Sequence, residues 1–124
     1  MTEVIKSLAD ISDRYDALFV DLWGCVHNGI KAFSSANESL KKYRYQGGKV
    51  VLVTNSPRPR SGVEKQLKKF GVDFDAWDLI ATSGDSARMA MFRGVVGSKV
   101  YFIGTPFEEN FFEPLNVVNG PVNI

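Results

Sequence analysis

The sequence predicts an α/β fold built on a doubly wound parallel sheet. Short, strongly apolar runs alternate with longer segments of helical periodicity, which is the order that successive β-α units produce. The apolar runs end in polar or glycine-containing turns, and the connections between elements are short. Because crossovers between such units are almost always right-handed, we expect the strands to lie parallel in one sheet.

The length and composition fit one ordinary domain. The chain has 124 residues, of which 44% are hydrophobic, and this is enough for a packed core. A net charge of +1 lacks the strong field of a dedicated nucleic-acid or membrane binder. One cysteine cannot form an internal disulfide, and no apolar stretch approaches the ~20 residues that span a bilayer. We therefore expect a cytoplasmic protein with no nucleic-acid and no membrane partner.

The first β-α unit begins with a strand at residues 17–20. These residues are continuously apolar, as expected for a strand that is covered on both faces. Ser35 and Glu38 have the spacing of a capping box, in which each side chain satisfies a free backbone donor at a helix start. Gly47 and Gly48 then end this helix, because glycine readily adopts the left-handed conformation.

The second unit has the same order of signals. Residues 49–53 predict a strand, and Pro57 prevents further pairing because proline has no backbone N–H. Ser61 and Glu64 have the spacing of a second capping box. The helix that they open is expected to end at Gly71.

Two further units and an apolar tail complete the chain. A third strand is expected at residues 79–81, followed by a helix at 85–95. A fourth strand at 99–103 leads into a short helix at 107–112. The tail, residues 117–124, is apolar but has no evident partner element.

The carboxyl ends of the strands are the place to look for chemistry. In doubly wound sheets, ligands bind beyond these ends, on one edge of the sheet. Four polar clusters are expected there: Asp21, Thr54-Asn55-Ser56, Thr82-Ser83-Gly84 and Gly104-Thr105.

Two of these clusters suggest specific chemistry, although each also has a purely structural interpretation. Asp21 follows an apolar strand, where a carboxylate binds a cation, attacks a phosphorus or carbon centre, or only caps a turn. Thr54, Asn55 and Ser56 offer donors that either cradle a phosphate or stabilise their own loop. Arg58 follows directly and either contacts the phosphate or extends into solvent.

Together the two clusters carry a family resemblance. Residues 18–24 (LFVDLWG) followed by 50–56 (VVLVTNS) resemble the haloacid dehalogenase superfamily, and its class IIA branch of para-nitrophenylphosphatase and N-acetylglucosamine-operon phosphatase type. Residues 82–85 (TSGD) and 100–104 match later positions of that branch. The resemblance covers nearly all of this chain but only about the first half of a family member.

The resemblance implies a role for each matching residue. Asp21 would be the nucleophile that forms an aspartyl-phosphate, and also a Mg²⁺ ligand. The backbone carbonyl of Trp23 would be a second metal ligand. Thr54 and Asn55 would hold the transferring phosphoryl group. Ser56 and Arg58 are also expected to bind the phosphate. The implied substrate is a small phosphorylated metabolite.

The sequence departs from the family pattern in two respects. The family usually has a second Asp two positions after the nucleophile as the general acid, and here that position is Trp23, whose indole cannot exchange a proton near neutral pH. His27 is either a substitute or an ordinary hydrogen-bonding residue. The family's later lysine and acidic metal-binding motif have no counterpart in this chain.

These departures lead to three expectations. Residues 1–124 are interpreted as the N-terminal part of the core domain, without the cap domain and the C-terminal half of the core, and with little or no activity alone. The rival hypothesis is a non-catalytic binding module on the same fold. An exposed apolar edge at residues 17–20 predicts a homodimer, because unpaired edge strands invite pairing with another chain.

Overall fold

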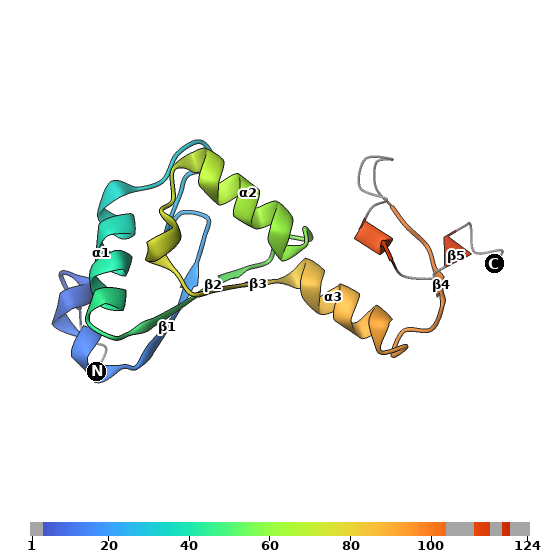
Figure 1. The fold of residues 1–124 in the computed structure, drawn as a ribbon, viewed down its shortest axis with the longest axis horizontal. Helices are drawn as coiled ribbons and strands as arrows, with labels where there is room; N and C mark the ends of the chain where they lie inside the picture. Colours follow the sequence, from blue (N-terminus) through green and yellow to red (C-terminus); the bar gives the residue numbers. More distant parts are fainter. Residues whose placement is uncertain (1–3, 104–110, 115–117, 120–124) are drawn as a thin grey trace.

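The computed structural model describes residues 4–103 and 111–114, together with the backbone of 118–119. Its centre is a parallel three-stranded sheet in the order β1-β2-β3 (Figure 1). The strands are β1 (Ala17–Asp21), β2 (Lys49–Thr54) and β3 (Leu79–Thr82). The helices are α1 (Ser34–Tyr45), α2 (Arg60–Phe70) and α3 (Ser83–Phe92), with short 3₁₀ turns at Leu8–Asp10, Ser12–Arg14 and Phe74–Ala76. The predicted α/β fold with a parallel sheet is confirmed.

One face of the sheet carries the hydrophobic core. Alternate residues of the strands, Val50, Leu52 and Ile80, point to this face and are at most 5% exposed. They pack against α1 and α2, which both lie on the same side of the sheet in Figure 1. The helix residues in this cluster are Leu40, Tyr43, Val63 and Leu67. The core therefore fixes the strands through one layer of helices.

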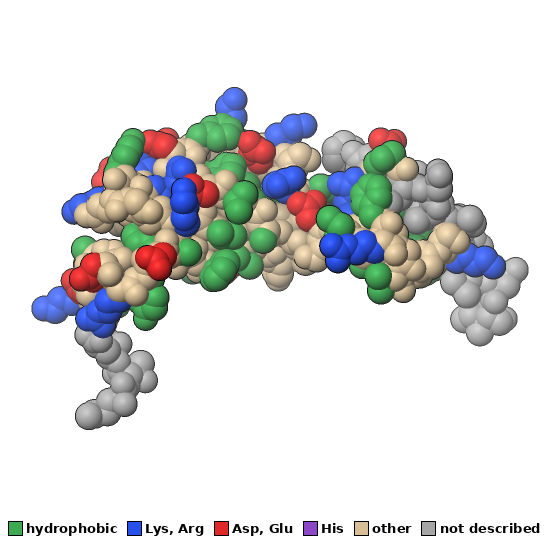
Figure 2. All heavy atoms as spheres, turned by 60° about the horizontal axis from the view of Figure 1, so that its bottom comes forward, with side chains coloured by type: hydrophobic (Ala, Val, Ile, Leu, Met, Phe, Trp, Pro, Cys, Tyr) green, Lys and Arg blue, Asp and Glu red, His purple; other side chains and the backbone are tan. Residues whose placement is uncertain are grey.

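The other face of the sheet is open among the described residues. Phe19, Val51 and Leu79 lie side by side in register across the three strands. Phe19 is 79% exposed and Leu79 is 57% exposed. Figure 2 shows hydrophobic side chains gathered at the surface in the middle of the molecule. The expectation that the first strand is covered on both faces is thus wrong for the part of the chain that the structure describes.

The helix starts differ from the predicted capping boxes. α1 follows Phe33, whose N–H is bonded to Val26, and no side chain caps the helix. α2 follows Pro59, whose φ of −58° already suits a helix. The predicted caps at Ser35 and Ser61 are therefore wrong, since both residues lie inside the first turn. The predicted end at Gly71 is confirmed, with a left-handed φ of 84°.

The fourth strand does not join the sheet. β4 (Lys99–Val100) pairs in parallel with β5 (Val118–Asn119), which lies in the apolar tail. α3 leads away from the central sheet toward this pair (Figure 1). The expected four-strand sheet is therefore wrong for the described residues. Gly104, Thr105 and most of the helix expected at 107–112 lie outside the described residues.

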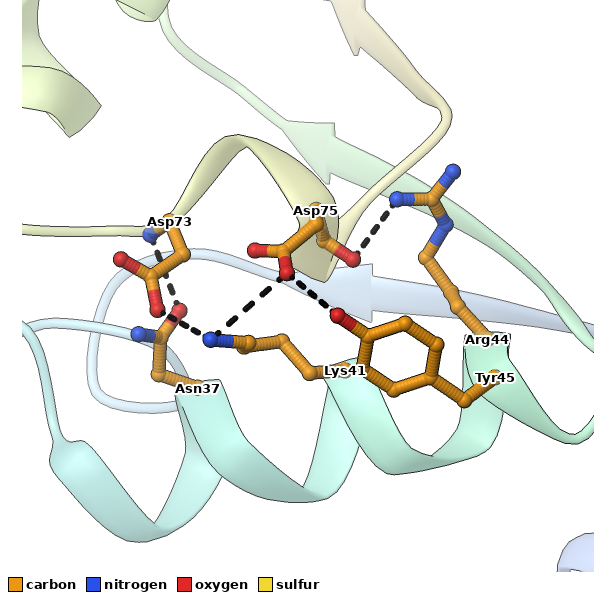
Figure 3. A network of polar contacts seen from close by, with 6 residues as sticks. All are labelled: Asn37, Lys41, Arg44, Tyr45, Asp73 and Asp75. Atoms are coloured by element: carbon orange, nitrogen blue, oxygen red, sulfur yellow. Dashed lines mark hydrogen bonds and ion pairs between the residues drawn. The ribbon is translucent and has the colours of Figure 1, made fainter.

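A polar network holds α1 to the segment before β3 (Figure 3). The Lys41 ammonium lies 2.8 Å from a carboxylate oxygen of Asp73 and 3.6 Å from one of Asp75. The Tyr45 hydroxyl donates to the Asp75 carboxylate at 2.9 Å, and the Asp73 N–H donates to Asn37. These contacts extend along α1 from its first turn, at Asn37, to its last residue, Tyr45.

A second group of polar contacts, at the amino ends of β2 and β3, connects these strands with α1. The Arg44 guanidinium donates two hydrogen bonds to the Asp78 carboxylate, at 2.9 and 2.8 Å. The Val50 N–H donates to the same carboxylate at 2.8 Å. The Arg44 hydrogen bonds, and then the Val50 N–H, lower the pKa of Asp78 below its usual value. The pair therefore fixes α1 to the amino ends of β2 and β3.

None of the helices in the described ranges is long and apolar enough to cross a membrane.

Candidate functional site

An open depression at the carboxyl ends of β1 and β2 brings two of the predicted clusters together. It is lined by Phe19, Asp21, Val53, Thr54 and Asn55. Asp21 is the last residue of β1 and pairs with Val53, directly before Thr54. Because the two strands are parallel and in this register, the carboxylate and the Thr-Asn turn lie on the same rim of the sheet. The Asp21 side chain is exposed rather than turned into the core.

The turn after β2 is held by hydrogen bonds between its own residues. The Ser56 N–H donates to the Thr54 hydroxyl oxygen at 3.2 Å, and the Arg58 N–H donates to the Ser56 hydroxyl oxygen at 3.3 Å. Since the Thr54 oxygen accepts one of these bonds, its own proton stays available for an anion. Ser56 and Arg58 are not among the residues that line the depression, and the Arg58 side chain is exposed. The phosphate-binding roles of all four residues stay predictions.

The loop after β1 is ordered around His27. This side chain is 4% exposed and packs between the rings of Trp23 and Phe70, at centroid distances of 5.7 and 4.8 Å. Its Nδ1 accepts the Gly29 N–H at 3.0 Å. Burial lowers the pKa of His27, and the nearby Asp21 carboxylate partly opposes this change. The contacts give His27 a clear role in organising the loop.

Trp23 and Gly29 depend on each other. Gly29 has a φ of +85°, and a Cβ at this position would lie 2.3 Å from the Trp23 ring. Only glycine allows this approach, because it has no side chain. The Trp23 ring therefore packs directly against the backbone of Gly29. Trp23 itself is 67% exposed and stands at the position where the resemblance expects an acid.

The oxygen atoms at Asp21 are of the type that a hard cation prefers, but there are too few of them for a complete ligand set. Between residues 4 and 103 no hydrogen-bond donor contacts the Asp21 carboxylate or the Trp23 carbonyl, so both keep free lone pairs. No group of three or more acidic, His or Cys side chains is placed to hold a metal within the described residues. Mg²⁺ prefers six oxygen ligands and keeps several waters, so these two oxygens would hold it weakly.

The third polar cluster predicted at this edge, Thr82-Ser83-Gly84, lies against the turn after β2, where the Ser83 hydroxyl is 2.8 Å from the Asn55 carbonyl oxygen. The predicted helix start at residue 85 is wrong by two residues. In the structure α3 begins at Ser83, and Thr82 caps it by accepting the Asp85 N–H at 2.9 Å. The Thr-x-x-Asp spacing was the available signal, because this is the pattern of a helix N-terminus.

Fold and site together define a parallel α/β protein that presents one carboxylate beside a hydroxyl- and amide-bearing turn. The family model for haloacid dehalogenase-like hydrolases matches residues 18–117. The chain therefore belongs to this family, which confirms the superfamily resemblance in the sequence.

A solved structure of the same family gives a measure of the similarity. The crystal structure of a haloacid dehalogenase-like hydrolase from Brucella suis 1330 has a TM-score of 0.86 and 39% sequence identity to this chain. The comparison covers 96% of this chain and 45% of that chain, so this chain spans less than half the length of the Brucella protein. No match to the sequence was found among curated proteins.

Proposed function

We propose that this chain contributes the nucleophile and phosphate-binding turn of a Mg²⁺-dependent phosphatase that acts on a small phosphorylated metabolite. The observation that carries the proposal is the shared depression lined by Asp21, Thr54 and Asn55. A nucleophilic carboxylate next to hydroxyl and amide donors is what attack on an anionic phosphate requires. Membership of a hydrolase family supports the same reaction class.

The proposed reaction proceeds through an aspartyl-phosphate. An oxygen of Asp21 bonds to phosphorus while the bond from phosphorus to the ester oxygen breaks, and the leaving oxygen takes up a proton. Water then attacks the aspartyl-phosphate, which returns the carboxylate and releases inorganic phosphate. During both steps the Thr54 hydroxyl and the Asn55 amide donate to the phosphoryl oxygens and stabilise their charge.

Mg²⁺ would be held by the Asp21 carboxylate and the Trp23 carbonyl, where its charge offsets the repulsion between carboxylate and phosphate. The indole of Trp23 cannot protonate the leaving group. His27 is buried, and its Nδ1 is already bonded to Gly29. The proposal therefore leaves the proton to solvent or to a group beyond the described residues.

The rival function is a binding module without turnover, and Trp23 at the position of the expected acid favours it. In that case the turn at residues 54–56 holds a phosphorylated ligand, and Asp21 contributes no covalent step. The two functions differ in one consequence. Ligand binding by a module survives Asp21→Asn, whereas phosphatase turnover does not.

The finer assignments belong to the same proposal. We infer class IIA membership from the two motifs around Asp21 and Asn55. The N-terminal part of the core domain is the interpretation that fits a chain spanning 45% of the Brucella protein. Cytoplasmic location fits the single cysteine.

The test compares two substitutions of exposed aspartates at opposite ends of β1. Hydrolysis of para-nitrophenyl phosphate, with and without Mg²⁺, is measured for the 124-residue chain and for the product of its complete reading frame. We expect little activity from the chain alone. In the complete product, Asp21→Asn should reduce turnover by roughly 10³-fold or more, because it removes the nucleophile. The control Asp16→Asn should leave turnover unchanged. Equal activity of Asp21→Asn and Asp16→Asn would refute the proposed mechanism.

A further inference from the structure

The first two residues of α3 are bonded to the turn that the proposed function assigns to phosphate. The Ser83 hydroxyl lies 2.8 Å from the carbonyl oxygen of Asn55 and 2.9 Å from that of Ser56. The Gly84 N–H donates to the same Ser56 carbonyl at 3.1 Å. Two successive carbonyl groups of the turn are therefore directed at α3.

Gly84 also sets how close α3 can come to this segment. A Cβ at Gly84 would lie 2.2 Å from the Pro57 carbonyl oxygen and 2.5 Å from that of Arg58. Both atoms belong to the backbone, so a side chain here would have to displace the segment itself. The residue is buried, and its missing side chain is what lets the helix start rest on residues 57–58.

The start of α3 is itself held in place. The Thr82 hydroxyl oxygen accepts the Asp85 N–H at 2.9 Å, which caps the helix. The Asp85 carboxylate accepts the Arg60 N–H at 3.2 Å and so connects α3 to the start of α2. The start of α3 is thus bonded both to the turn at Asn55 and Ser56 and to Arg60, where α2 begins.

We propose that Ser83 and Gly84 are positioning residues for phosphoryl binding, an inference that rests on the proposed function. A carbonyl oxygen that faces a phosphate repels it, whereas hydroxyl and amide donors attract it. By bonding the carbonyls of Asn55 and Ser56, α3 turns them away from the depression lined by Asp21, Thr54 and Asn55. The donors of the turn are then left to face the anion without rearrangement, which is the condition for effective charge stabilisation.

The experiment measures binding of orthophosphate in the presence of Mg²⁺ to the product of the complete reading frame, in which the proposed function is tested, by isothermal titration calorimetry. Ser83→Ala removes the hydroxyl donor and should weaken binding about 2- to 12-fold, which corresponds to the loss of one hydrogen bond. Ser83→Thr keeps the hydroxyl at an exposed position and should bind as the unsubstituted chain does. The matched control is Ser86→Ala, because the Ser86 hydroxyl of the same helix bonds to the Thr82 carbonyl, at 3.2 Å, and within the described residues to no group of the turn.

Three outcomes separate the inference from the function on which it rests. Unchanged affinity in Ser83→Ala, or failure of Ser83→Thr to restore it, would overturn the inference alone. Absence of phosphate binding by the unsubstituted chain would overturn the proposed function and the inference together. Loss of affinity in Ser83→Ala with normal binding in Ser83→Thr and Ser86→Ala supports the inference. If Ser83→Ala does not fold, Ser83→Cys replaces it, since a thiol is only a weak donor.

Discussion

The two faces of the central sheet differ although both are apolar. On the face toward α1 and α2, Leu52 is fully buried and Ile80 is 5% exposed. On the opposite face Phe19 is 79% exposed and Leu79 is 57% exposed. The covered face holds the strands together, and the open face ends in the rim that carries Asp21. A continuous apolar run therefore shows that both faces of a strand are suited to burial, but not that the same part of the chain buries both of them.

The largest expected difference between the faces lies in their contribution to stability. Leu52→Ala leaves a cavity in the covered face and should lower the free energy of unfolding by about 2–5 kcal/mol. Leu79→Ala removes the same atoms from the open face and should cost at most about 1 kcal/mol, because little area leaves water there. Urea denaturation monitored by circular dichroism measures both. Equal losses would mean that the open face is packed as tightly as the covered one.

The sequence predicted those parts of the fold that depend on neighbouring residues and on strand order. Parallel pairing of β1 and β2 follows from their apolar runs and short connections, and it alone brings Asp21 beside Thr54. The starts of α1 and α2 were missed because they are set by tertiary contacts. Phe33 is bonded to Val26 from the preceding loop, and this contact has no local signature.

The part of the site that the sequence could not supply is the support behind the turn. Ser83 and Gly84 are 26 or more residues from the carbonyls that they approach. Their place at this edge of the sheet was predicted, but no local pattern shows that they bond to the carbonyls of Asn55 and Ser56. The pairing of the fourth strand could not be predicted from local sequence either, because this strand pairs with β5 in the apolar tail. Contacts of this kind become visible only once the elements are placed in space.

An intermediate loss of stability is expected when Asp78, at the amino end of the covered face, is replaced. Asp78 accepts two bonds from Arg44 and one from the Val50 N–H, and its side chain is only 18% exposed. Asp78→Asn should therefore lower the free energy of unfolding at pH 7 by about 1–3 kcal/mol. The control Asp73→Asn, which removes the charge of a solvent-screened pair with Lys41, should cost clearly less.

The contribution of the Arg44–Asp78 pair to stability should depend on pH, and the direction of the change follows from the pKa of Asp78. The pKa of Asp78 is lowered in the folded chain, so its contribution is complete above the unfolded value of about 3.9 and is lost as pH falls through the folded value. The stability difference between the unsubstituted chain and Asp78→Asn should be constant near neutrality and shrink below about pH 4. A difference that grows on acidification would contradict this assignment.

The smallest expected effect on folding, and the most informative about the open face, concerns self-association. β1 is an edge strand of the described sheet, so we predict that two copies pair along this edge as a homodimer. Phe19, in the middle of this strand, is 79% exposed. Phe19→Lys should weaken association while changing the free energy of unfolding by about 0.5 kcal/mol or less. Ile30→Lys is the matched control, because Ile30 is 80% exposed in the loop outside the sheet. Sedimentation velocity over a range of concentrations measures both variants. A monomer at every concentration would exclude the dimer, and equal weakening by both variants would show that general hydrophobicity, not the open face, drives association.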